Sequence, residues 1–288
     1  LAQFKEAGAG VKLLPMKTII VPVDFSEQSE FALKTAASLA KRHDSEIIVL
    51  HMLELNYAMI SSSEAYHPEQ TVFLIKAAEK RLGEFLDKDY LEGIKVTPVI
   101  KHYKVFSEVN EVAEAHNADL VVMGSHGTDG LQEIFFGSNA EKVVRNSEIP
   151  VLVVKEELPD FSIDTFVFAC DFRDDALPAF KRAKEFADKL GATFRAVYIN
   201  TPGDHFMSTS DINEQVSKFL NTAKVGMEVD HYSDYSVERG VLNYSASMNA
   251  DLIGIPTHGR KGISHFFMGS IGEDIANHSS APVMTFKI

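Results

Sequence analysis

The chain has 288 residues, which is long enough for two domains of ordinary size. Its formal net charge of −13 argues against a nucleic-acid-binding surface, because contacts with phosphates need clustered Lys and Arg side chains. A single cysteine, Cys170, excludes an internal disulfide, and no apolar stretch approaches the roughly 18 residues that a membrane span requires. We therefore expect a cytoplasmic protein in which Cys170 is a buried, inert thiol.

Residues 1–15 lack the apolar core of a signal peptide, and we expect them to be a tag remnant or a disordered tail. We expect a first domain over residues 16–155 and a second over residues 163–288. The stretch between them is polar and contains a proline, which is typical of a linker.

Strand-like and helix-like patterns alternate along the first half. Apolar residues at spacings of three and four mark the helices. The strands are expected near residues 16–25, 47–52, 95–102, 120–123 and 151–154, and the helices near 31–40, 69–87 and 109–113 and after 137.

The second half repeats this order. Its first strand, at 163–172, ends in an Asp-Phe pair like that of residues 16–25. Further strands are expected near residues 193–199, 226–232, 252–255 and 283–286. Regular alternation of this kind predicts an α/β fold of two tandem doubly wound domains, each a five-stranded parallel sheet with helices on both faces.

A glycine pattern occurs almost twice. Gly124-Ser125-His126-Gly127 is followed, after nine residues, by Gly137-Ser138; in the second half, Pro256-Thr257-His258-Gly259 is followed at the same spacing by Gly269-Ser270. Each copy lies between a strand and a helix, where backbone N–H groups can converge on a phosphate.

In a doubly wound sheet, ligands bind beyond the carboxyl ends of the strands, where the strand order reverses. Asp24 and Gly124 end two strands that should flank this reversal, and Gly137 should open a helix. The glycines could equally serve as plain turns, with Ser138 as an N-cap. The chain has no Walker lysine motif and no dinucleotide-type glycine motif after its first strand.

These residues resemble the universal stress protein family, in particular its tandem two-domain members. The matching segments are Pro22-Val23-Asp24-Phe25-Ser26, His51-Met52, Val122-Met123-Gly124-Ser125-His126-Gly127, Gly137-Ser138 and Ile149-Pro150-Val151-Leu152-Val153-Val154. The resemblance covers nearly the whole chain from Met16 onward. The spaced glycine motif is similar to that of the ATP-binding branch of the family.

The resemblance implies an adenine nucleotide alpha hydrolase-like fold and an ATP site in the first domain. Pro22, Val23 and Asp24 would contact adenine and ribose, and Met52 and Met123 would line the adenine pocket. Gly124 and Gly127 would lie against the ribose and α-phosphate, whereas Gly137, Ser138 and Asn139 would bind the β- and γ-phosphates. Mg²⁺ would accompany the nucleotide.

The second copy departs from the family pattern. Pro256 replaces the first motif glycine and has no N–H, although Asp171, Gly259, Gly269 and Ser270 remain. We expect this second site to be weakened or lost. Family members pair through their last strands, so the resemblance also implies a pseudo-dimer within the chain or a homodimer.

The leading hypothesis is an ATP-binding stress-response regulator with an unknown protein partner. One alternative is a ligand-binding or interaction protein that uses the same clefts without nucleotide, which the change at Pro256 motivates. Another is a slow ATPase or autokinase. The motif contains no arginine finger or catalytic lysine, so no residue is assigned to catalysis, and none to a metal site.

Overall fold

The computed structural model describes residues 16–53, 68–102, 105–125, 137–204, 206–257 and 269–288. The elements of the first half are β1 (Thr18–Val23), α1 (Glu27–His43), β2 (Glu46–Leu53), α3 (Pro68–Leu86), a 3-10 turn (Asp89–Leu91), β3 (Val96–His102), α4 (Val105–His116), β4 (Leu120–Gly124), α5 (Ser138–Asn146) and β5 (Val151–Val154).

The second half repeats the order. Its elements are β6 (Thr165–Ala169), a 3-10 turn (Asp174–Ala176), α6 (Leu177–Leu190), β7 (Thr193–Asn200), α7 (Thr209–Ala223), β8 (Val229–Ser233), α8 (Val237–Ser247), β9 (Leu252–Thr257), α9 (Gly269–His278) and β10 (Val283–Lys287). The predicted α/β alternation is therefore confirmed. Strand β8 begins three residues later than expected, because α7 ends in a left-handed residue at Lys224 and the chain turns before Val229.

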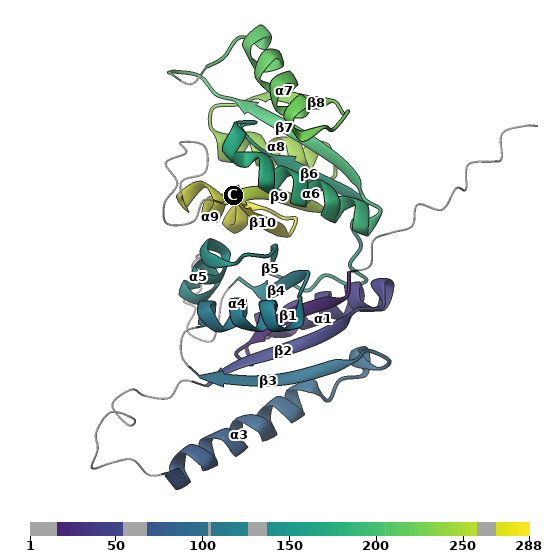
Figure 1. The fold of residues 1–288 in the computed structure, drawn as a ribbon, viewed down its shortest axis with the longest axis vertical. Coiled ribbons are helices and arrows are strands. Elements are labelled where there is room, and N and C mark those ends of the chain that lie inside the picture. Colours follow the sequence, from purple (N-terminus) through teal and green to yellow (C-terminus); the bar gives the residue numbers. More distant parts are fainter. Residues whose placement is uncertain (1–15, 54–67, 103–104, 126–136, 205, 258–268) are drawn as a thin grey trace, which may run out of the picture.

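The two halves form one continuous sheet of ten strands (Figure 1), in the order β3-β2-β1-β4-β5-β10-β9-β6-β7-β8. Neighbouring strands are parallel within each half, and the last strands of the halves, β5 and β10, pair antiparallel. In this central pair Leu152 lies opposite Met284. The halves are thus joined by backbone hydrogen bonds through their last strands.

Two equivalent aspartates hold the first strand of each half against its fourth. The Asp119 carboxylate accepts hydrogen bonds from the backbone N–H groups of Lys17 (2.7 Å) and Thr18 (3.3 Å). The Asp251 carboxylate accepts the same pair of bonds from Asp164 (3.0 Å) and Thr165 (2.8 Å). Both aspartates lie in Ala-Asp-Leu segments, at residues 118–120 and 250–252, and both align the first strand of their half with the fourth.

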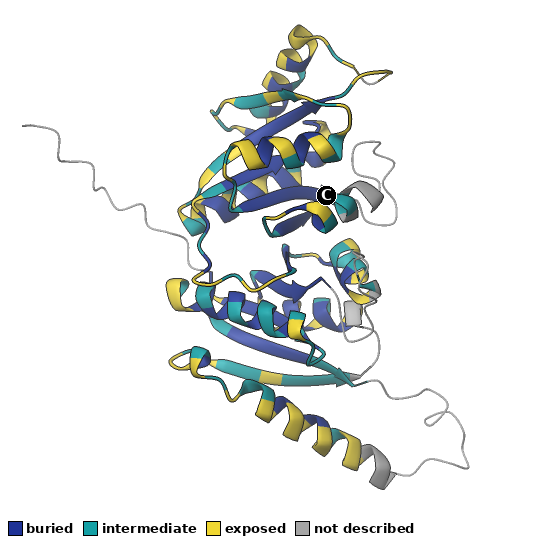
Figure 2. Cartoon of the chain, turned by 180° about the vertical axis from the view of Figure 1, so that it is seen from behind, coloured by how far each residue is buried: buried dark blue, intermediate teal, exposed yellow. Residues whose placement is uncertain are grey.

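The hydrophobic core is shared between the halves on one face of the sheet. One cluster there contains Leu33 and Leu152 from the first half together with Phe168, Phe180 and Phe286 from the second. The opposite face carries two separate clusters, one under α4 and α5 and one under α8 and α9. The inner strands are accordingly mostly buried, the edge strands β3 and β8 are half-buried with some exposed residues, and the outward faces of the helices are exposed (Figure 2).

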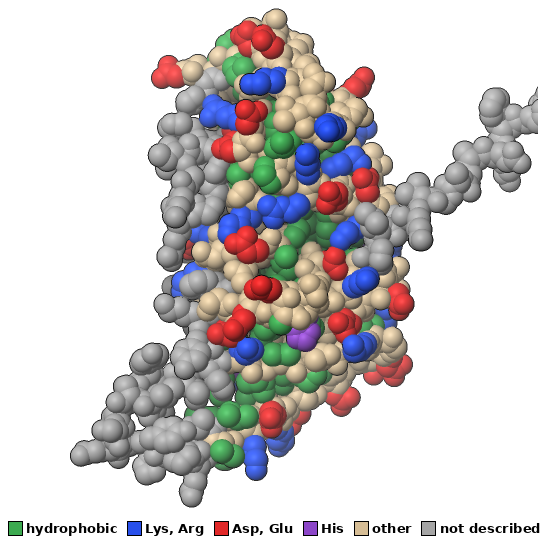
Figure 3. Space-filling model, in the orientation of Figure 1, with side chains coloured by type: hydrophobic (Ala, Val, Ile, Leu, Met, Phe, Trp, Pro, Cys, Tyr) green, Lys and Arg blue, Asp and Glu red, His purple; other side chains and the backbone are tan. Residues whose placement is uncertain are grey.

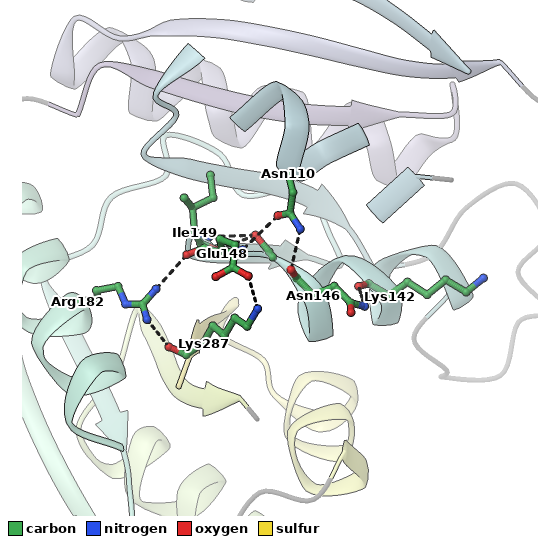
Figure 4. A network of polar contacts seen from close by, with 8 residues as sticks. Asn110, Lys142, Asn146, Glu148, Ile149, Arg182 and Lys287 are labelled. Carbon is green, nitrogen blue, oxygen red and sulfur yellow. Dashed lines mark hydrogen bonds and ion pairs between the residues drawn. The ribbon is translucent and has the colours of Figure 1, made fainter. Parts of the chain in front are cut away.

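Polar contacts also cross the junction (Figure 4). The Arg182 guanidinium on α6 donates to the backbone oxygens of Glu148 (3.0 Å) and Lys287 (2.7 Å), and the Lys287 ammonium pairs with the Glu148 carboxylate. Lys189 on α6 forms an ion pair with Asp119 at 2.7 Å. These bonds hold α6 of the second half against the ends of α5 and β4 of the first.

One pH effect on stability follows from His43 in the last turn of α1. Partial burial, together with the neighbouring Arg42 charge, lowers the pKa of His43. The unfolded chain then binds more protons than the folded chain, so the free energy of unfolding is expected to fall as the pH drops below about 6.5. Urea unfolding between pH 5 and 8 measures this, and His43→Gln should flatten the dependence. An unchanged slope in that variant would rule out His43 as the source.

Candidate functional site

The candidate site lies at the carboxyl ends of β1, β2 and β4. In the first half the strand order is β3-β2-β1-β4-β5, so the order reverses between β1 and β4. These two strands pair directly, with Ile19 opposite Leu120 and Ile20 opposite Val121. Ligands bind at such reversals in open α/β sheets, because the connections that follow the two strands run to opposite faces of the sheet and leave a crevice between the strand ends.

Asp24 follows β1 and shapes the turn into α1. Its Oδ1 accepts hydrogen bonds from the backbone N–H (3.0 Å) and the hydroxyl (2.5 Å) of Ser26. Ser26 in turn caps α1 by accepting a bond from the Ser29 N–H at 3.2 Å. Phe25 between them has a φ of 68°, a left-handed conformation. The turn therefore holds the partly exposed Asp24 carboxylate at the strand end.

Three side chains to which the sequence analysis gave no role support this turn. The Phe25 ring lies 4.4 Å from the His51 ring, and the Arg81 guanidinium on α3 lies 4.3 Å from the centre of the Phe25 ring. His51 Nδ1 is 2.9 Å from the backbone oxygen of Val23. The sequence signals for this cluster were the Asp-Phe pair that ends the first strand in both halves and the matching His51-Met52 segment, whereas nothing in the sequence pointed to Arg81.

The structure divides the predicted apolar contacts between the two faces of the sheet. Met123 is 6% exposed and belongs to the cluster under α4 and α5, against which Met52 also packs. Val23 belongs to the cluster on the α1 face. Alternation along β1 places Pro22 on the face opposite Val23. Pro22, Met52 and Met123 thus share one wall, and the Val23 side chain does not.

Gly124 has a packing reason to be glycine. A Cβ atom at this position would lie 2.9 Å from the backbone carbon and oxygen of Gln28 in the first turn of α1. Real Cβ atoms almost never come so close, and a backbone atom cannot swing away as a flexible side chain can. Gly124 therefore allows α1 to pack against the end of β4, directly beside Asp24.

The N-terminus of α5 is held at the end of β4. The Gly137 N–H donates to the backbone oxygen of Ser125 (2.8 Å), and the Ser125 N–H donates to Val154 (3.0 Å). Gly137 is the N-cap of α5 and supplies no side-chain cap. Ser138 and the exposed Asn139 begin the helix, so its first N–H groups and positive dipole end lie near the reversal. Gly127 and His126 lie outside the described residues.

The second half places Asp171 at the position equivalent to Asp24, but in different surroundings. Asp171 is 5% exposed, its Oδ2 lies 3.6 Å from Arg173 Nε, and its Oδ1 accepts the Arg173 N–H at 3.2 Å. Gln215 on α7 donates to its backbone oxygen at 2.6 Å. A cavity of about 220 Å³ opens beside these groups.

The remaining residues of the expected second site lie in β9 and at the start of α9. Pro256 is buried within β9, opposite Phe286 of β10. Gly269 and Ser270 begin α9, as Gly137 and Ser138 begin or precede α5, and Gly259 lies outside the described residues. The matching positions of these Gly-Ser pairs show that the repeat includes α5 and α9.

Cys170 is fully buried, and burial raises the pKa of its thiol well above the usual value. The expectation of a buried thiol is confirmed, and the raised pKa disfavours the reactive thiolate. Among the described residues, no three His, Cys, Asp or Glu side chains are grouped as a metal site. No helix in the described segments is long and apolar enough to cross a membrane.

Comparisons with known proteins point to one family for both halves of the chain. The model of the universal stress protein family matches residues 15–155 and again residues 162–287. Two relatives from Methanocaldococcus jannaschii, universal stress proteins MJ0577 and MJ0531, are 33% and 31% identical over 155 and 150 residues, or 49% of this chain in each case and 96% and 82% of theirs.

A solved universal stress protein from Archaeoglobus fulgidus matches the whole fold. The TM-score is 0.68 at 24% identity, with 95% of this chain and 97% of that chain covered. The two family matches coincide with the two halves of the ten-stranded sheet. The chain therefore belongs to the universal stress protein family and carries two of its domains in tandem.

Proposed function

We propose that this protein is an ATP-binding regulator of a stress response, with the nucleotide held by a first domain of residues 16–155. The observation that carries the proposal is the convergence of the Asp24 turn and the N-terminus of α5 at the strand-order reversal. A carboxylate suits ribose hydroxyls or base N–H groups, and an open helix N-terminus suits phosphates.

Different residues contact different parts of the nucleotide in this proposal. Asp24 accepts hydrogen bonds from the ribose or the base. Pro22, Met52 and Met123 form the apolar wall for adenine, while the Val23 backbone stays at the strand end. Gly124 and Gly127 lie against the ribose and α-phosphate, where the lack of a Cβ lets the backbone come close. Ser138 and Asn139 offer backbone N–H groups to the β- and γ-phosphates, and Gly137, whose own N–H is bonded to Ser125, leaves these phosphates room beside the helix N-terminus. Mg²⁺ bound to the phosphates would neutralise part of their charge in this acidic protein.

We propose that the second domain, residues 163–288, does not hold ATP tightly. Pro256 offers no N–H to a phosphate, and Arg173 is already paired with Asp171. The expected content is therefore one ATP per chain. Denaturing the purified protein and measuring the released nucleotide by chromatography and mass tests this. Recovery of ADP or AMP would favour turnover. If no nucleotide is released and calorimetry shows no binding of Mg-ATP, the nucleotide function is refuted.

Gly137→Val tests the placement of the phosphates. The bulky side chain at the N-cap of α5 should weaken Mg-ATP binding by at least about tenfold, which corresponds to about 1.4 kcal/mol. The φ of −59° and ψ of 143° at Gly137 are allowed for valine, so the fold should persist. Gly269→Val at the equivalent position of α9 is the matched control and should leave the affinity unchanged. Equal affinities of both variants would refute the assignment.

We place the protein in the cytoplasm and propose that its partner is another protein. Contacts of the nucleotide with the segment between Gly127 and Gly137, most of which lies outside the described residues, would change the surface presented to that partner. The halves already pair through their last strands within one chain. Acidic and basic side chains are interspersed over the face shown in Figure 3, so this face carries no single-sign field that would select a polyanion.

A further inference from the structure

The cavity in the second half has features of a ligand site of its own. It lies at the carboxyl ends of β6 and β7 and is reached by α7 and by the first residue of α8, Val237. Tyr198 in its wall belongs to the core cluster on the α6 and α7 face, whereas Ile199 belongs to the cluster on the α8 and α9 face. The cavity therefore crosses the carboxyl edge of the sheet.

Three charged residues line this cavity, and they leave a negative balance. Asp171 and Arg173 form an ion pair at 3.6 Å, with the carboxylate buried and the guanidinium about half exposed. Asp204 also lines the cavity and is exposed. The lining thus holds two carboxylates and one guanidinium, so its formal charge is −1. A ligand with a single positive charge would balance it.

The other walls are mainly apolar and partly aromatic, with the polar residues Thr201 and Gln215 among them. Phe206 is 64% exposed, an unusual exposure for a phenylalanine, and it lies two residues from Asp204 in the loop after β7. Met207, Ile199 and the Tyr198 ring continue the apolar surface, and the Tyr198 hydroxyl donates to the Met207 sulfur at 3.4 Å. A carboxylate beside an aromatic face is a recognition pattern for organic ammonium groups.

The same features disfavour a nucleoside triphosphate. The two carboxylates would repel phosphates, and the guanidinium that could attract them is held by Asp171. A cavity of about 220 Å³ is also smaller than the roughly 300–1,000 Å³ typical of drug-sized ligands. The net charge of −13 raises the local concentration of cations around the protein.

We propose that this second-half cavity binds a small organic monocation, an amine with an apolar body. Its ammonium group pairs with Asp204 and lies against the Phe206 ring, and its apolar body packs on Met207, Ile199 and Tyr198. The two halves of the chain then differ in ligand chemistry: the first suits an anion and the second a cation.

The test uses the full chain and two probes that differ in charge, 2-phenylethylamine and its neutral analogue 2-phenylethanol. Calorimetric titration is expected to show saturable one-to-one binding of the amine and at least tenfold weaker binding of the alcohol. Asp204→Asn should weaken amine binding by at least tenfold. Glu214→Gln is the matched control: it removes one exposed acid from α7, outside the cavity lining, and should leave the affinity unchanged.

Each contrary result overturns the proposal. Absence of saturable amine binding would show that the cavity does not recognise cations. Equal affinities for the amine and the alcohol would show that charge plays no part. Equal losses of amine affinity in Asp204→Asn and Glu214→Gln would show that the overall charge of the protein, and not the cavity, attracts the amine. Displacement of the amine by Mg-ATP in a chain carrying Gly137→Val would assign the cavity to nucleotide instead.

Discussion

Replacement of Phe286 by alanine is expected to lower the free energy of unfolding by about 3–5 kcal/mol. Phe286 lies on β10, the strand that joins the halves, and is fully buried. Its ring lies 6.1 Å from the ring of Phe166, 5.9 Å from that of Phe168 and 6.4 Å from that of Phe186. Truncation therefore leaves a cavity among rigid aromatic neighbours that cannot collapse to fill it.

Urea unfolding followed by circular dichroism measures the loss. The cluster that contains Phe286 also contains residues of the first half, so we expect the variant to unfold in one transition at a lower urea midpoint. Phe73→Ala on α3 is the matched control, because Phe73 is 72% exposed and its truncation should change the stability by no more than about 0.5 kcal/mol. Similar effects of the two substitutions would contradict the shared core.

Gly124→Ala is expected to destabilise the protein by about 1–3 kcal/mol, although it adds a single methyl group. The added Cβ would lie 2.9 Å from backbone atoms of Gln28, so α1 or β4 must shift. Because α1 begins at the turn that holds Asp24, the same shift should also weaken Mg-ATP binding.

Gly83→Ala on α3 is the matched control, with the opposite expected sign. Apart from the nearby backbone of α3 itself, no atom of the described residues lies within 4 Å of a Cβ built at Gly83, and alanine favours a helix over glycine by roughly 0.5–1 kcal/mol. Thermal or urea unfolding of the two variants measures the difference. A neutral or stabilising Gly124→Ala would show that the strand end tolerates a side chain and that packing does not require this glycine.

Much of the fold could be predicted from local patterns. Apolar spacing placed the helix at 69–87, and the structure has α3 at Pro68–Leu86. The strand predicted at 95–102 appears as Val96–His102. Such patterns are local, because the apolar face of a helix or a buried strand is formed by residues only a few positions apart in the sequence. The repeat of these patterns then predicted two domains of one kind.

The candidate site was less open to prediction. The sequence placed Asp24 and Gly124 at strand ends, and β1 and β4 do lie side by side. It did not reveal that Gly124 is needed by α1, that Val23 faces away from Met123, or that Arg81 supports Phe25. Each of these depends on contacts between residues far apart in the chain, which no local periodicity encodes.

The sequence by itself determined that this protein is a duplicated α/β chain with a strand-end aspartate in each half and a spaced glycine motif that the second half carries in altered form. The tertiary structure decided that the halves share one ten-stranded sheet and one core face, and that Asp171 is paired with Arg173 beside a cavity. The physical reason is range: secondary structure follows from neighbouring residues, whereas strand pairing, ion pairing and cavities follow from how distant surfaces meet.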